Sequence, residues 1–175
     1  MQKTNLEKLT DLEICVLKEF QENCRKNLDD IGKKCGCSRY KVARIIKKLE
    51  EKKIIIGYRA VVDPSNLNIN YYTILVKRTS KPLTEDIIKN LSIGAFTDIL
   101  PEIDIKIIDT IYFNGHYDFI INFFADELTK AKELCNRIMQ SYYPYIEKVE
   151  LLSMVMPFRF NGVRILQPDE KSKIL

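Results

Sequence analysis

The chain has 175 residues, enough for one domain of ordinary size or two small ones, and its 46% hydrophobic content is that of a globular protein rather than a disordered one. Residues 1–63 hold 15 basic and 10 acidic side chains and residues 64–175 hold 13 and 14, so the net charge of +4 comes entirely from the N-terminal third. No apolar run approaches the roughly 18 residues that span a membrane, and the first residues lack the pattern of a signal peptide. We therefore expect a cytoplasmic protein with a localised positive charge.

The five cysteines, Cys15, Cys24, Cys35, Cys37 and Cys135, are an odd number and contain no second pair that would complete a zinc site. The single histidine lies far from most of them along the chain. We expect reduced, mostly buried thiols, with no metal and no cofactor.

The first third of the chain predicts three short helices. Thr10 and Glu13 have the spacing of a capping box, which predicts a helix from Asp11 to about Asn23. A second helix is expected from Leu28 or Asp29 to Cys35. Gly36 then suits a left-handed turn and Ser38 suits the N-cap of a third helix, so the order is that of a helix-turn-helix. The β-rich run 54–62 that follows predicts a small hairpin or wing.

A turn-rich break at 63–68 separates this part from a second one. Beyond it the pattern predicts a strand, a helix opened by Thr84 and Glu85, two strands joined by a tight turn at 114–117, a helix capped by Asp126, and a last strand. The four strands are expected at 71–79, 103–113, 118–125 and 146–156. The order β-α-β-β-α-β is the ferredoxin-like plan, so the fold class is α+β. The strand 118–125 is apolar on both sides, so the sheet face that the helices leave bare needs a cover. We expect a second copy of the chain there, with a ligand pocket or another domain as the alternatives.

The third helix carries an apolar stripe and a cationic face. Val42, Ile45, Ile46 and Leu49 fall on one side at 100° per residue, and the other side is basic. A cationic helix fits the major groove of double-stranded DNA, where Arg and Lys reach phosphates and guanine edges. The residues expected to contact DNA are Ser38, Arg39, Tyr40, Lys41, Arg44, Lys47, Lys48 and Arg59. The alternative is an ordinary solvated face, and it is strongest for Lys52 and Lys53 at the helix end, where the dipole favours cations.

Four segments together resemble the winged helix-turn-helix of the Lrp/AsnC, or feast/famine, transcription regulators: 9–17, 31–38, 44–50 and 54–58. The run Asn114-Gly115-His116-Tyr117-Asp118 resembles the Gly-x-x-Asp turn of their effector-binding RAM domain. The resemblance covers about residues 9–156. It implies a winged helix-turn-helix domain at 1–63 and a RAM domain at 64–160, followed by a tail at 161–175 that lies beyond the family's core.

The resemblance further implies a DNA-binding transcription regulator that forms a homodimer through its RAM sheets. Tetramers or octamers are built from such dimers in this family, and an amino acid or related small molecule changes DNA binding or assembly. Two departures stand out: Gly32 replaces the usual alanine, and Lys53 replaces a glycine after the third helix. Because a lysine in a left-handed C-cap costs roughly 1 kcal/mol, we expect this helix to end differently.

The turn 114–118 is the expected effector site. Asp118 offers a carboxylate for an ammonium group, Gly115 allows close approach, and His116 is a donor or acceptor near neutral pH. Asn114 and Tyr117 complete the turn. The structural alternative is that a hairpin simply needs such residues.

Two other functions are consistent with the same architecture. Siroheme decarboxylases resemble this two-domain family and use histidine chemistry, but their histidine motif has a nearby arginine that is lacking around His116. A protein with an effector domain and a vestigial helix-turn-helix is the third possibility. The charge excess of the first 63 residues disfavours it, because a vestigial helix has little reason to stay cationic.

Overall fold

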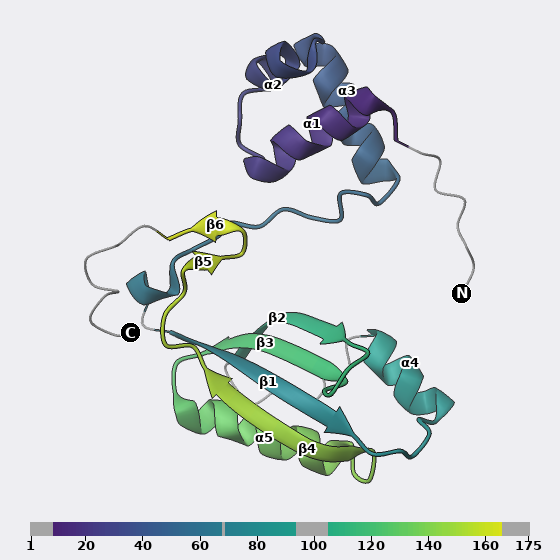
Figure 1. Cartoon of the computed structure of the whole chain (residues 1–175), viewed down its shortest axis with the longest axis vertical. Helices are drawn as coiled ribbons and strands as arrows, with labels where there is room; N and C mark the ends of the chain where they lie inside the picture. The colour runs from purple at the N-terminus through teal and green to yellow at the C-terminus, as the bar shows by residue number, and fades with distance from the viewer. Residues whose placement is uncertain (1–8, 68, 94–104, 166–175) are drawn as a thin grey trace. The chain divides into compact units, whose positions relative to one another are not determined.

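The computed structural model describes residues 9–67, 69–93 and 105–165, and these form two compact units that divide between Ala60 and Val61. We call the first the helical unit and the second the sheet unit. The former is helical and the latter is a sheet with helices (Figure 1).

The helical unit consists of α1 (Asp11–Glu22), α2 (Leu28–Cys35) and α3 (Arg39–Glu51). Its capping signals are confirmed. Thr10 and Glu13 form the reciprocal capping box at the start of α1, and the Ser38 hydroxyl accepts a hydrogen bond from the Lys41 N–H at the start of α3. The core is made of side chains from all three helices: Val16, Ile31, Val42, Ile45 and Leu49.

The turn between α2 and α3 is tight for two local reasons. Gly36 is left-handed, with φ of 65°, as the sequence predicts. A Cβ atom on Gly32 would lie 2.6 Å from the carbonyl oxygen of Cys37, so only glycine lets the turn pass this close to α2. The helix-turn-helix is therefore built on backbone contact that larger residues would break.

The predicted wing is wrong: residues 54–62 form no strand. Ile54 and Ile55 pack against the helical core instead, and their N–H groups both donate to the carbonyl of Leu49 at the end of α3. Tyr58 then lies edge-on to Phe20 of α1, with ring centres 5.6 Å apart. These contacts hold residues 54–58, which we call the strap, against the helices, and the strap pairs with no strand among the described residues.

The expectation that α3 ends differently because of Lys53 is also wrong. Lys53 adopts the left-handed conformation, with φ of 54°, and its N–H donates to the carbonyl of Glu50. The hydrogen bonds from the following strap to Leu49 hold this geometry.

The sheet unit contains β1 (Asn70–Arg78), α4 (Glu85–Ile93), β2 (Ile105–Tyr112), β3 (Phe119–Ala125), α5 (Leu128–Ser141) and β4 (Ile146–Ser153). A single 3₁₀ turn (Pro64–Asn66) precedes it. The strands pair antiparallel in the order β2-β3-β1-β4, which confirms the ferredoxin-like α+β fold. Residues 103 and 104 of the predicted second strand lie outside the described residues. The N-cap of α5 is Glu127 rather than Asp126, because the Asp126 carboxylate pairs with Lys130.

The two faces of the sheet differ. Helix α5 lies along one face (Figure 1), where it buries alternate residues of β1 and β3 around Ile74, Phe123 and Ile138. On the other face a short hairpin of β5 (Arg159–Phe160) and β6 (Val163–Arg164) places Phe160 against Tyr71 and Phe124. The bare face predicted from the sequence is thus partly covered by the chain itself, although Ile111 and Leu152 remain 44% and 49% exposed.

Candidate nucleic-acid interface and effector site

Helix α3 presents the cationic face that its sequence predicts. Val42, Ile45 and Leu49 are buried against α1 and α2, which fixes the rotation of the helix about its axis. Tyr40 at its start is 86% exposed, an unusual position for an aromatic ring that no protein contact explains among the described residues.

The cations of α3 divide by what they already bind. Lys41 and Arg44 form no ion pair within the described residues. Arg39 lies 3.8 Å from Asp29 and Lys47 lies 4.0 Å from Glu51, both as exposed pairs that contribute little. Lys41 and Arg44 are therefore the cations of α3 most available to an anionic partner.

Lys48 has a structural partner. Its ammonium lies 2.7 Å from the carboxylate of Glu13, which is only 6% exposed. This hydrogen bond, together with that from the Thr10 N–H, lowers the pKa of Glu13 from 4.5 to about 2. Lys48 thus fastens α3 to α1, and its expected role in DNA contact competes with this one.

A groove runs between the start of α1 and the exposed side of α3. It brings four of the expected DNA-binding residues together, namely Lys41, Arg44, Lys47 and Lys48. Thr10 and Leu12 of α1 form its other wall, a contribution that the sequence pattern of α3 alone does not reveal. Arg59 is exposed in the segment after the strap, outside α3.

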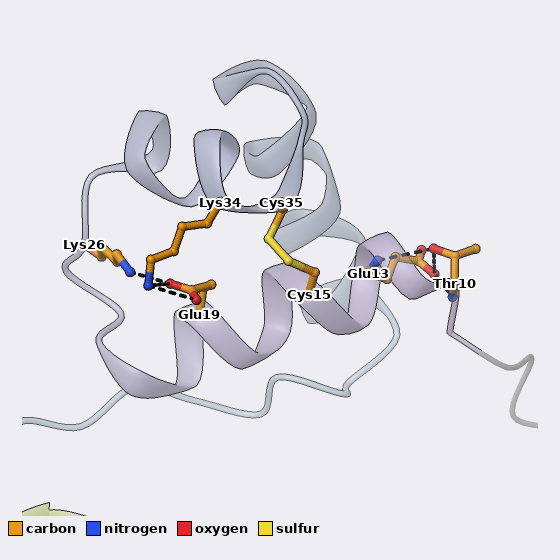
Figure 2. The surroundings of a disulfide bond; sticks show 7 residues. All are labelled: Thr10, Glu13, Cys15, Glu19, Lys26, Lys34 and Cys35. Carbon is orange, nitrogen blue, oxygen red and sulfur yellow. Dashed lines mark hydrogen bonds and ion pairs between the residues drawn. A yellow bond between two sulfur atoms is a disulfide. The ribbon is translucent and has the colours of Figure 1, made fainter.

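The expectation that all thiols are reduced is wrong, because the structure holds a disulfide between Cys15 and Cys35. The bond joins α1 to the end of α2 (Figure 2). The two Cα atoms lie 5.8 Å apart. Cys24, Cys37 and Cys135 are free. The sequence hides this pair, since residues 20 apart on two different helices share no recognisable spacing.

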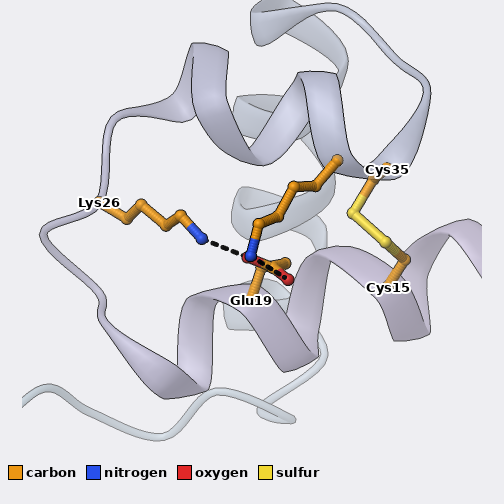
Figure 3. A network of polar contacts seen from close by, with 5 residues as sticks. Cys15, Glu19, Lys26 and Cys35 are labelled. Carbon is orange, nitrogen blue, oxygen red and sulfur yellow. Dashed lines mark hydrogen bonds and ion pairs between the residues drawn. A yellow bond between two sulfur atoms is a disulfide. The ribbon is translucent and has the colours of Figure 1, made fainter.

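A polar cluster reinforces the same junction. Glu19 of α1 accepts from Lys26 in the α1–α2 loop (Figure 3) and lies 3.0 Å from the ammonium of Lys34 on α2. Hydrogen bonds from these two lysines lower the pKa of Glu19. The two lysines thus link the α1–α2 loop and α2 to α1 through one carboxylate.

The predicted effector turn is the β2–β3 hairpin loop. Asn114, Gly115 and His116 are exposed, whereas Tyr117 and Asp118 are half-buried. The Tyr117 hydroxyl donates to Glu150 of β4, a bond that raises the pKa of the tyrosine. The loop therefore offers exposed groups at its tip and fixed ones at its base.

Asp118 is engaged within the chain. One carboxylate oxygen accepts a 2.8 Å hydrogen bond from the Arg78 N–H, and the backbone of Asp118 bonds to both Val76 and Phe113. A structural role for Asp118 is thereby established in addition to any ligand contact. Arg78, which the sequence does not single out, is brought to the base of the turn.

The described residues contain no group of histidine, cysteine and acidic side chains arranged to hold a metal ion. Within the same residues no helix has both the length and the apolar character needed to cross a membrane.

Comparison with known proteins gives related transcription regulators. No protein-family profile matches the chain. The regulator Ptr1 of Methanocaldococcus jannaschii is 27% identical over 139 residues, which cover 79% of this chain and 84% of Ptr1. The leucine-responsive regulatory protein of Haemophilus influenzae is 34% identical over 68 residues, or 39% of this chain and 41% of that protein.

Solved structures share the fold over nearly the whole chain. An AsnC family transcriptional regulator from Agrobacterium tumefaciens has a TM-score of 0.65 at 19% identity, covering 93% of this chain and 99% of its own. The transcriptional regulator NMB0573 of Neisseria meningitidis, solved as a complex with L-Met, has a TM-score of 0.65 at 18% identity, covering 87% and 94%.

Proposed function

We propose that the chain is a member of the Lrp/AsnC transcription regulators, a DNA-binding regulator whose activity responds to an amino acid or a related small molecule. The observation that carries the proposal is the free cationic start of α3. Lys41 and Arg44 are held outward by a buried stripe and find no anion within the described residues.

The geometry of α3 suits the major groove of DNA. Its 13 residues make a rod of about 20 Å, and the exposed Tyr40 and Arg44 lie on the side away from the core. Ser38 and Arg39 begin the helix, where phosphate contact is favoured by the N–H groups and the dipole. Lys47 continues the same face, while Lys48 and Arg59 are secondary candidates because one is paired and the other lies off the helix.

Affinity for DNA at several salt concentrations tests this proposal. Arg44→Ala should weaken binding and reduce the log–log salt slope by about 0.9 if the side chain contacts one phosphate. Lys18→Ala, which removes an exposed charge from α1 of the same unit, is the matched control and should change neither quantity. Equal effects of the two variants would mean that net charge, and not the face of α3, drives the binding.

For the effector we propose the turn 114–118. The Neisseria meningitidis regulator, which shares the fold, was solved as a complex with L-Met, and here His116 is exposed at the tip of the loop while Asp118 lies at its base. Because Asp118 also accepts the Arg78 N–H, alanine would remove a structural bond together with any ligand contact. Asp118→Asn keeps an acceptor oxygen but loses the charge, so it should abolish the response of DNA binding to an amino acid while leaving DNA binding without effector intact. A full response in this variant would place the effector elsewhere.

We further propose a homodimer that packs through the open face of the sheet, with larger assemblies built from it. The exposed Ile111 and Leu152 on this face support the proposal. Leu152→Glu should shift the protein to monomer in sedimentation. Val155→Glu places the same charge on the segment after β4, and the dimer should persist in this variant if the interface lies on the sheet. A DNA-binding regulator of this kind works in the cytoplasm, which we propose as its location.

The enzymatic alternative gains no support from the site. His116 is exposed at a loop tip, its ring lies edge-on to Tyr117, and no arginine contacts it among the residues that the structure describes. We therefore propose that the protein is not an enzyme. An unchanged spectrum on addition of siroheme-type substrates is the expected result, and turnover of such a substrate would refute it.

A further inference from the structure

Tyr40 is the most exposed aromatic side chain of the described residues, and it lies in the first turn of α3. Its ring is 86% exposed, and its hydroxyl forms no hydrogen bond within the part of the chain that the structure describes. A single exposed ring is common on protein surfaces. What this one does therefore depends on where around the helix it lies.

Tyr40 stands at the centre of the outward face of α3. At 100° per residue, the buried side chains of the helix cluster in a direction about 170° away from it. The exposed Arg39 and Lys41 lie about 100° to either side. When such a helix enters the major groove, the centre of its outward face meets the base pairs and its flanks meet the two phosphate backbones. Tyr40 thus points toward the bases, between two cations that point toward phosphates.

The centre of this face is apolar, and its surroundings are charged. Ala43 is also exposed and lies three residues further on, where it is the neighbour of Tyr40 on the helix surface. Every other exposed side chain of α3 carries a charge. Charged groups suit phosphates and the polar edges of bases, whereas a phenol ring and a methyl group suit a carbon-rich partner. In the major groove the base edges present one such group, the 5-methyl of thymine.

We propose that Tyr40 is a specificity-determining residue that recognises thymine through its 5-methyl group. The ring contacts the methyl group, and Ala43 adds a second apolar contact beside it. The inference rests on the proposed function, because it names the base that the outward face of α3 reads. It gives a sequence preference to a surface whose cations alone would bind any duplex.

Replacing thymine by uracil tests the contact. Selection from a random pool of DNA duplexes with the full-length protein supplies the site, and each thymine of that site is then replaced singly by uracil, which lacks only the methyl group. At least one replacement should weaken binding by the parent about fourfold, the effect of leaving one methyl group unburied. Tyr40→Phe keeps the ring and should show the same discrimination, whereas Tyr40→Ala should bind the thymine and uracil duplexes alike. Because Tyr40 is exposed, both variants should fold as the parent does.

Lys41→Ala is the matched control, because it removes the adjacent exposed side chain of the same turn. It should reduce the log–log salt slope of DNA binding by about 0.9 and keep the discrimination between thymine and uracil. Tyr40→Ala should do the opposite, losing the discrimination and keeping the salt slope.

Three results would overturn the inference: no thymine at which the parent discriminates, discrimination that persists in Tyr40→Ala, or discrimination that is lost in Tyr40→Phe. The proposed function survives each of them if Lys41→Ala still reduces the salt slope. A parent chain that binds no duplex refutes both.

Discussion

Breaking the Cys15–Cys35 disulfide should destabilise the helical unit selectively. The bond joins α1 to α2 beside the turn that leads into α3, so it restrains the unfolded helical unit more than any other part of the chain. The perturbation is the double substitution Cys15→Ala and Cys35→Ala, which removes the bond without leaving an unpaired thiol.

The size of the effect follows from the loop that the bond closes. For a sequence separation of 20 residues, the loss of chain entropy in the unfolded state corresponds to about 3 kcal/mol at 25 °C. The ion pairs from Glu19 to Lys26 and Lys34 span the same junction and remain in the variant. We therefore expect a weakened helical unit that still folds.

Hydrogen exchange measured by mass spectrometry resolves the two units. Amides in α1, α2 and α3 should exchange faster in the variant by a factor equivalent to about 3 kcal/mol, and those of β1 and β3 should not change. Cys24→Ser, which removes an exposed free thiol, is the matched control. A reductant added to the parent should reproduce the variant.

Thiol titration in denaturant gives the result that would refute the reasoning. The parent should show three reactive thiols, those of Cys24, Cys37 and Cys135, out of five cysteines. Five reactive thiols in protein purified without reductant would show that the bond does not form. Since disulfides are rare in the cytosol of most organisms, this measurement also bears on the proposed location.

Three further predictions concern the helical unit. Lys53→Gly should raise the free energy of unfolding, measured by urea titration, by about 1 kcal/mol, because the φ of 54° at this position suits glycine. A loss of stability would mean that the lysine side chain is needed. Gly32→Ala should lower it by about 1 to 3 kcal/mol, since its Cβ would lie 2.6 Å from the Cys37 carbonyl, and a neutral result would show that the turn can move. The carboxylate of Glu13 has a pKa lowered from 4.5 to about 2. Its contribution to the free energy of unfolding is therefore complete above pH 4.5 and is lost as the pH falls toward 2. The stability difference between the parent and Glu13→Gln should shrink across that range, and a constant difference would exclude the Lys48 pair as its source.

Local signals carried most of the fold prediction. The Thr10 capping box, the Gly36 turn and the Ser38 cap each depend on a few neighbouring residues, so the sequence alone locates the three helices to within a residue or so. The four strands follow from short runs of strand-forming residues bounded by turn residues, which is equally local. Errors arose where a non-local contact decided the outcome.

The strap after α3 illustrates such a contact. Ile54, Ile55 and Tyr58 have strand-forming side chains, yet they pack on the helices because the apolar core and Phe20 lie within reach. The disulfide and the Arg78 environment are non-local in the same sense: they depend on which residues the fold brings together, and no spacing in the sequence encodes them.

The cations of α3 also differ in their non-local contacts, and this difference indicates which end of the helix a DNA duplex should approach. In its second half Lys47 faces Glu51, Lys48 is bound to Glu13, and Glu50 accepts from Tyr58, so acidic side chains accompany the cations there. In its first half Lys41 and Arg44 have no such partners within the described residues, and the helix dipole makes cations unfavourable at that end unless an external anion is present. We infer that DNA phosphate is that anion. Removing Lys41 or Arg44 should therefore reduce the salt dependence of DNA binding, whereas removing Lys48 should chiefly lower the stability of the helical unit, because Glu13 would then be buried without its counter-charge.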